Sequence, residues 1–267
     1  MSVEVLSPLV TRVLAPNPSL MTLQGTNTYL VGTRDLVVID PGPDMPEHVE
    51  AIISAVGPSR RIVASLVTHR HGDHLPAAHR LRERIGAPVR GHAMLPGVTE
   101  PLVDAERVSL AGAALTALHT PGHTRDHLCF RLAQEAALFS GDLIAGTGTV
   151  VVGDEPGDLG LYLESLRRVA SLDLRLIYPG HGPVVADSAG KVAEYIEHRE
   201  SRIREVFLAL QDGVDTVEAL VARIYPTVNP RLVGAAGRNV RACLDKLAHD
   251  GLISPAADGR YRPAADR

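Results

Sequence analysis

Short apolar runs rich in β-branched residues mark the first part of the chain and predict strands. Runs at 28–31 and 36–39 flank a turn at 32–35, a pattern typical of a β-hairpin. A third run, at 62–67, is short, apolar and partly β-branched, which indicates a buried strand.

Two helices are predicted around that buried strand. Asp44, with Glu47 three residues later, forms a capping-box pattern and is the expected N-cap of the first helix. Apolar residues at helical spacing follow it: Val49, Ile52, Ile53 and Val56. Pro76 opens the second helical pattern, which runs to Ile85 and which Gly86 can end.

From residue 87 to 139 the pattern changes to short strands. They are expected at 107–110, 114–118, 128–132 and 136–139, the last two as a hairpin. A helix at 160–170 and a strand at 174–178 follow.

After Asp187 the pattern becomes mainly helical. Helices are expected at 192–210, at 216–224 with Asp215 as N-cap, and near 231–249, followed by a small hairpin around Asp258-Gly259. Helices followed by a hairpin outline a winged-helix module. We therefore expect two domains, 1–186 and 187–267.

Polar chemistry is concentrated in the loop after the buried strand. Residues 68–74 read Thr-His-Arg-His-Gly-Asp-His, which places His69, His71, Asp73 and His74 together. Three later loops, each after a predicted strand and each with a neighbouring glycine, carry further candidates: His123, Asp142 and His181.

These seven residues are typical metal ligands. Neutral imidazole and carboxylate suit zinc, and also iron or manganese. Seven ligands are too many for one tetrahedral site, but they suit two metals ~3.5–4 Å apart, bridged by a carboxylate and a hydroxide. The chain has 12 histidines, and seven of them lack such a setting and are interpreted as surface or packing residues: His48, His79, His92, His119, His127, His198 and His249. His127 is also a candidate for orienting a ligand.

The order His69-x-His71-x-Asp73-His74, then His123, Asp142 and His181, resembles the metallo-β-lactamase superfamily. The resemblance implies an α/β fold, an αββα sandwich with two metals at one edge, followed here by a small winged-helix-like domain. It implies that His69, His71 and His123 hold the first metal. Asp73, His74 and His181 would hold the second, with Asp142 bridging. Asp40 matches a turn that braces the metal loops.

Asp142 narrows the range of functions that the resemblance implies. The commonest zinc β-lactamases have cysteine at this place, so antibiotic hydrolysis is not expected as the main role. Further segments are similar to the beta-lactamase-like protein 2 group: 21–30, 120–124 with Asp126-His127, and Ser165-Leu166. That group includes endoribonucleases that act on single-stranded RNA and thioester hydrolases that release polyketides from a carrier protein.

We therefore expect a dinuclear metal hydrolase, with two Zn²⁺ per chain, that cleaves ester, thioester or phosphodiester bonds. Asp73 would bind metal and position the hydroxide or pass its proton. Three alternatives stay open: a single-strand RNA endoribonuclease, a mononuclear iron oxidoreductase like the persulfide dioxygenases, and a nucleic-acid-binding regulator. The substrate would be a small-molecule ester or thioester, or RNA.

Composition bears on these alternatives. The net charge is −4, and residues 187–267 hold 12 Lys/Arg and 12 Asp/Glu, so the C-terminal module is neutral where a phosphate-binding winged helix is expected to be basic. With no Trp and three Phe, base stacking is also disfavoured. We interpret the module mainly as a lid and packing element.

Location is expected to be cytoplasmic. The first 20 residues lack the basic and apolar regions of a signal peptide, and no apolar run approaches the ~18 residues of a membrane span. Cys129 and Cys243 are interpreted as buried thiols in a reducing compartment.

Overall fold

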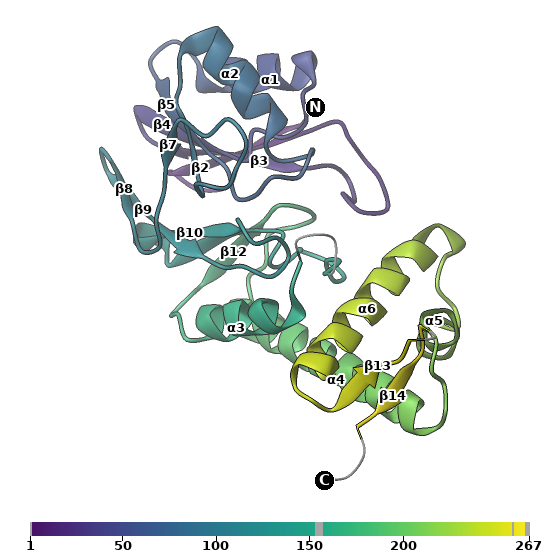
Figure 1. Cartoon of the computed structure of the whole chain (residues 1–267). Helices are drawn as coiled ribbons and strands as arrows, with labels where there is room; N and C mark the ends of the chain where they lie inside the picture. The colour runs from purple at the N-terminus through teal and green to yellow at the C-terminus, as the bar shows by residue number, and fades with distance from the viewer. Residues whose placement is uncertain (1, 153–156, 258, 265–267) are drawn as a thin grey trace. The chain divides into compact units, whose positions relative to one another are not determined.

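The computed structural model describes residues 2–152, 157–257 and 259–264 (Figure 1). The chain forms two compact units that interleave along the sequence. The first unit comprises Met1–Thr120, Asp126–Val150 and Ala170–Lys191, and the second comprises Pro121–Arg125, Val151–Val169 and Val192–Arg267. The expected domain limit at 186/187 stays a prediction, and the change of unit falls a few residues later, inside a helix.

A seven-stranded sheet in the first unit follows chain order. Its strands are β1 (Val3–Val5), β2 (Val10–Leu14), β3 (Asn27–Gly32), β4 (Asp35–Ile39), β5 (Arg61–Leu66), β6 (Val89–Gly91) and β7 (Glu100–Pro101). Strands β1 to β4 pair antiparallel, and β4 to β7 pair parallel. The predicted hairpin and buried strand are confirmed, whereas no sequence pattern predicted β1, β2, β6 and β7.

Helices α1 (Pro46–Val56) and α2 (Pro76–Ile85) lie together on one face of this sheet (Figure 1). The predicted start of α2 at Pro76 is confirmed, and Gly86 ends it in the left-handed conformation, with φ 73°. The prediction that Asp44 caps α1 is wrong. Met45 occupies the N-cap without a side-chain hydrogen bond, and Asp44 instead forms an ion pair with Arg80.

The second sheet of this unit has five strands in the order β12-β11-β10-β9-β8. They are β8 (Arg107–Leu110), β9 (Ala113–His119), β10 (Leu128–Leu132), β11 (Ala137–Gly141) and β12 (Leu176–Pro179), with the 3₁₀ turn η1 (Ala133–Glu135) before β11. Only β11 and β12 pair parallel among the described strands of this sheet. Their carboxyl ends therefore lie at the same edge.

One apolar core joins the two sheets. Tyr29 of β3 packs edge-on against Phe139 of β11, with ring centroids 5.1 Å apart, and Phe139 stacks on Tyr178 of β12 at 5.0 Å. All three side chains are buried and belong to the same cluster. Because aromatic side chains remove large apolar areas from water, this contact fixes one sheet against the other.

The second unit is mainly helical. It contains α3 (Leu159–Ala170), most of α4 (Ser188–Gln211), α5 (Val217–Ile224), the 3₁₀ turn η2 (Pro230–Leu232), α6 (Val233–His249) and a hairpin of β13 (Ile253–Pro255) with β14 (Tyr261–Pro263). The predicted N-cap Asp215 is wrong. Thr216 caps α5 by accepting a hydrogen bond from Ala219 N, and Asp215 pairs with Arg260 at 2.9 Å.

Among the described residues, every helix is too short or too polar to span a lipid bilayer.

Candidate metal centre

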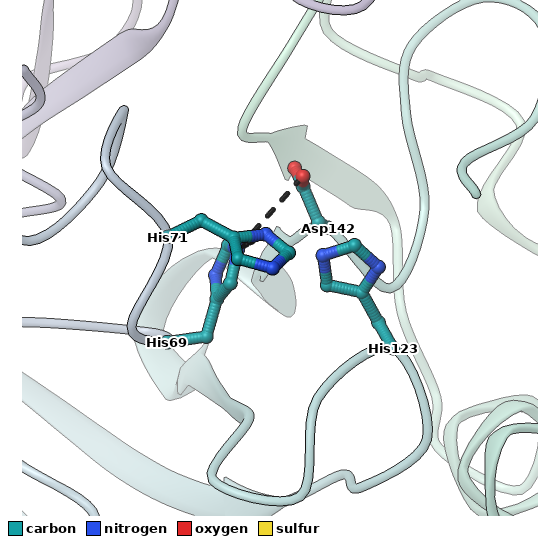
Figure 2. Close-up of side chains that lie close together, drawn as sticks. All are labelled: His69, His71, His123 and Asp142. Carbon is teal, nitrogen blue, oxygen red and sulfur yellow. Dashed lines mark hydrogen bonds and ion pairs between the residues drawn. The ribbon is translucent and has the colours of Figure 1, made fainter. Parts of the chain in front are cut away.

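The seven predicted ligands gather in two groups near strand ends. The ligand atoms of His69, His71, His123 and Asp142 lie within 4.8 Å of one another (Figure 2). Those of Asp73, His74 and His181 form a second group with the same limit. The structure thus brings together all the residues that the sequence singled out, while their role as metal ligands stays a prediction.

Asp40 organises the loop that follows β5. Because β4 and β5 are parallel, Asp40 at the end of β4 lies beside the start of that loop. Its Oδ1 accepts a hydrogen bond from Thr68 N and its Oδ2 accepts one from Thr68 Oγ1, both at 2.8 Å. Asp40 has φ 47°, an uncommon backbone conformation for a residue other than glycine. As predicted, Asp40 braces the metal loop, because its buried carboxylate accepts two hydrogen bonds from Thr68.

The same carboxylate orients two imidazoles. Thr68 Oγ1 donates to Asp40, so it accepts from Nδ1 of His69, 2.9 Å away. His74 Nδ1 donates directly to Asp40 Oδ2 at 2.8 Å. Nδ1 of each ring therefore carries a proton, and Nε2 of each ring faces the site.

His71 completes the cluster on this loop. Its Nδ1 lies 3.0 Å from Nε2 of His69, so both nitrogens face the same point. The two rings are nearly perpendicular, with an interplanar angle of 77°.

Asp142 faces both groups. Its Oδ2 lies 3.9 Å from His69 Nε2 in the first group. Its Oδ1 lies 3.5 Å from His74 Nε2 and 3.4 Å from His181 Nε2 in the second. One carboxylate thus directs a different oxygen atom toward each group.

The backbone before Asp142 requires glycine. Gly141 has φ 47°, and a Cβ at this position would lie 2.7 Å from Thr68 Oγ1 and 2.8 Å from His127 Nε2. His127 in turn accepts a hydrogen bond from Asp142 N at 3.2 Å. The prediction that His127 orients a ligand agrees with this bond.

Asn27 holds the loop of His181, a contact that sequence reasoning missed. The Asn27 Nδ2 atom donates to the carbonyls of Pro179 and Gly182, each at 2.9 Å. The backbone of Thr26 also pairs with His181. A buried asparagine at the start of β3 was the available signal, but its partners lie more than 150 positions away.

His123 lies on the loop between β9 and β10. Its Nδ1 is 2.8 Å from the carbonyl oxygen of Val151. A carbonyl only accepts, so Nδ1 carries the proton and Nε2 is the ligand atom offered to the first group.

The carboxylates favour positive charge on the histidines. Burial alone would lower the pKa of His74, but the carboxylates, Asp73 first and Asp142 next, outweigh burial and raise this pKa to about 9. Burial would also lower the pKa of His181, but Asp142 and Asp73 raise it to about 11.

The pKa values of the acids move in the opposite direction. Burial would raise the pKa of Asp142, but the neighbouring His181 and His74 hold it well below its usual range. The pKa of Asp73 is also lowered, since His74 and His181 outweigh the effect of burial. A buried site that draws in protons this strongly stabilises cations, and the nitrogen and oxygen donor set suits a divalent transition metal. The residues therefore fit the group that the sequence predicted.

His48 has a structural contact instead. It is fully buried, and its Nε2 lies 2.9 Å from Thr28 Oγ1. Burial lowers the pKa of His48 to about 4, so the imidazole is neutral at pH 7. This agrees with its interpretation as a packing residue.

Comparison with family models identifies two regions. Residues 21–181 match the model described as "Metallo-beta-lactamase superfamily", and residues 216–262 match the "Beta-lactamase associated winged helix domain". The winged-helix outline predicted from the C-terminal pattern is thereby confirmed.

Several relatives match most of the chain. A beta-lactamase-like protein 2 homolog of Caenorhabditis elegans is 38% identical, with 94% of this chain and 88% of that protein covered. An atrochrysone carboxyl ACP thioesterase of Aspergillus terreus is 39% identical, with 94% and 83% covered.

Solved structures share the fold, and so confirm the predicted αββα sandwich with a winged-helix domain. A metallo-beta-lactamase family protein of Thermus thermophilus is 24% identical, with a TM-score of 0.81 over 97% of this chain and 100% of that chain. A beta-lactamase domain protein of Burkholderia ambifaria is 20% identical, with a TM-score of 0.86 over 98% and 93%. The protein TTHA1623, solved in a di-iron-bound form, is 29% identical, with a TM-score of 0.55 over 68% and 96%.

Proposed function

Because this chain belongs to the metallo-β-lactamase superfamily and is a metal-dependent hydrolase, we propose that it cleaves thioesters at a dinuclear metal centre. The metal we propose is zinc, two ions per chain, since imidazole and carboxylate donors suit Zn²⁺.

The geometry of Asp142 carries the proposal of two metals. Its two oxygen atoms face different ligand groups, at 3.9 Å from His69 Nε2 and at 3.4 Å from His181 Nε2. A carboxylate placed in this way would be able to hold two ions, one with each oxygen atom. A relative of known structure also holds two metals, although its ions are iron.

The protein residues have separate roles in this proposal. Two bound metals would supply a nucleophile at neutral pH by lowering the pKa of bound water to ~7. His69, His71 and His123 would bind one ion, and Asp73, His74 and His181 the other.

Asp73 is the proposed proton acceptor. Its side chain is 28% exposed, against 12% for that of Asp142, so it stands at the solvent side of the site. Its Oδ2 lies 3.2 Å from His181 Nε2, which fixes the carboxylate's direction. Asp73 would hold the attacking water in line and take its proton on a carboxylate oxygen.

The name of one relative supports thioesters as the proposed substrate class. The Aspergillus terreus protein is named a thioesterase, and similarity to it extends over 94% of this chain. The sequence also left esters, phosphodiesters and single-stranded RNA open, and these belong in the same test.

The experiment combines elemental analysis with a substrate panel. We expect about two zinc ions per chain, and turnover of an acyl pantetheine thioester above that of a carboxyl ester, a phosphodiester and single-stranded RNA. The variant Asp142→Asn should lose metal and about 10³-fold in turnover, or ~4 kcal/mol of transition-state stabilisation. The control is Asp35→Asn, because Asp35 pairs with Arg61 at the surface.

Full turnover by metal-free protein would refute the metal mechanism. If RNA is cleaved faster than the thioester, the proposed substrate class is wrong, and the chain is a phosphodiesterase. One iron per chain with consumption of oxygen would favour an oxidoreductase like the persulfide dioxygenases.

A further inference from the structure

The loop that carries His123 belongs to the second unit. Pro121–Arg125 joins two strands of the five-stranded sheet, but it groups with Val151–Val169 and with Val192–Arg267. One proposed metal ligand is therefore supported by different residues from the other six.

A series of hydrogen bonds leads from His123 to the winged-helix region. His123 Nδ1 donates to Val151 O at 2.8 Å. The next backbone N–H, that of Val152, donates to Asn239 Oδ1 on α6 at 3.1 Å. Arg199 on α4 donates from Nη1 to the same oxygen at 3.3 Å. A single amide oxygen thus receives a backbone donor and a guanidinium donor.

The same loop is held from its other side by α3. Gly122 O accepts from Asp158 N at 2.7 Å, and Pro121 O accepts from Ser165 Oγ at 2.7 Å. Tyr162 of α3 lies under the guanidinium of Arg199, whose Cζ is 5.3 Å from the ring centroid. Arg199 and Tyr162 are both buried, so this support is part of the packed interior.

We propose that Asn239 is a positioning residue for His123. By holding the N–H of Val152, Asn239 fixes the peptide plane between Val151 and Val152, and the Val151 carbonyl then points at Nδ1 of His123. This bond selects the tautomer with the proton on Nδ1 and directs Nε2 toward the first ligand group. The inference rests on the proposed metal site for its effect on binding, but not for its effect on the tautomer.

The expected effect is confined to one metal. Changing an outer partner of a metal-binding histidine weakens metal binding about 10–100-fold. Asn239 acts through one intervening peptide, so we expect about tenfold weaker binding of the ion held by His69, His71 and His123. The ion held by Asp73, His74 and His181 should be retained, because Asp40 and Asn27 support that group.

The test compares three variants of the full chain. Asn239→Ala removes the acceptor, and Asn239→Asp keeps an acceptor for both Val152 N and Arg199. Asn229→Ala is the matched control, because Asn229 Oδ1 accepts a backbone N–H from Arg231 at 3.0 Å in η2. The Asn229→Ala variant therefore removes a side-chain acceptor of a backbone N–H at another place in the same unit.

Two measurements are made on each variant. Titration of metal-free protein with Zn²⁺ gives the two binding constants. Long-range ¹H–¹⁵N correlation spectra of the metal-free protein report which ring nitrogen of His123 carries the proton. We expect Asn239→Ala to weaken one site about tenfold and to mix the His123 tautomers. Asn239→Asp should restore both readouts, and Asn229→Ala should match wild type.

Several outcomes would overturn the proposal. Asn239→Ala with wild-type binding constants and an unchanged His123 tautomer refutes it. Equal weakening of both sites, together with a lower melting temperature and no change of tautomer, would show a merely structural role. If the wild-type chain binds no zinc, the proposed function fails, while the spectra still decide whether Asn239 sets the tautomer.

Discussion

The two sides of the candidate metal centre are supported in different ways. On one side, Asp40 bonds to Thr68 and His74, which lie 28 and 34 positions further along the chain. On the other, His123 depends on Val151, and the residue after Val151 bonds to Asn239, 87 positions away. The first support lies at the carboxyl ends of the parallel strands β4 and β5, and the second comes from Asn239 on helix α6 of the other unit.

This difference predicts how many ligand groups are disturbed when each support is lost. A buried carboxylate with three donors holds two rings at once, so its loss should disturb both ligand groups. A carbonyl held through a neighbouring peptide holds one ring, so its loss should disturb one group. The number of metals lost therefore reports which support was broken.

The largest effect is expected from Asp40→Asn. The amide would direct an N–H₂ group at donors that now bond to a carboxylate, while removing a buried charge beside His74. We expect both metals to bind more than about 100-fold more weakly, and the free energy of unfolding to fall by about 3–5 kcal/mol. Zinc titration and urea unfolding of the metal-free chain measure the two effects. Loss of one metal alone would show that Asp40 supports a single group.

The second largest effect is expected from Gly122→Ala, which strains the loop that carries His123. A Cβ at Gly122, whose φ is +137°, would lie 2.3 Å from the backbone of Tyr162. We expect a loss of about 3 kcal/mol of unfolding free energy and weaker binding of one metal only. Gly213→Ala is the control, since its φ is +84° with no neighbour within 4 Å. Equal destabilisation by both variants would show that backbone strain, and not the contact with Tyr162, is responsible.

The smallest effect concerns His48, whose partner Thr28 donates to the Asp40 carbonyl at 2.7 Å. Burial lowers the pKa of His48 from 6.5 to about 4 in the folded chain. Between these values the unfolded chain binds the extra proton, so acidification favours unfolding. From pH 7 to 5.5 this group should remove about 1 kcal/mol of stability. Urea unfolding of wild type and His48→Gln at both pH values measures the difference, and an equal pH dependence of the two would contradict the assignment.

Local sequence patterns were sufficient to predict much of the fold. Strand β5, helix α2 and the metal loop between them follow from an apolar run, a proline at the first helical position and a terminal glycine. The edge strands β1 and β7 carried no signal because they are short and largely exposed. Both predicted aspartate caps were wrong, since arginines 36 and 45 positions away pair with these carboxylates instead.

The candidate site divides in the same way. Its seven histidines and aspartates were apparent because metal chemistry restricts the residue types and because each follows a strand or opens a loop. Apart from Asp40 and His127, the residues that orient them are asparagines, a threonine and backbone carbonyls whose partners are set by the tertiary fold. Asn27 and Asn239 have no local motif, so only the structure reveals their contacts.

The interleaving of the two units limits how the chain can be divided. Pro121–Arg125 and Val151–Val169 are threaded through the sequence of the first unit, but they pack with the C-terminal helices. A truncation after residue 186 would not release a self-sufficient enzyme, because it would leave these two segments without the helices that complete their packing. The winged-helix region therefore cannot be exchanged by itself. A chimera that replaces this region would also need to replace the His123 loop and α3.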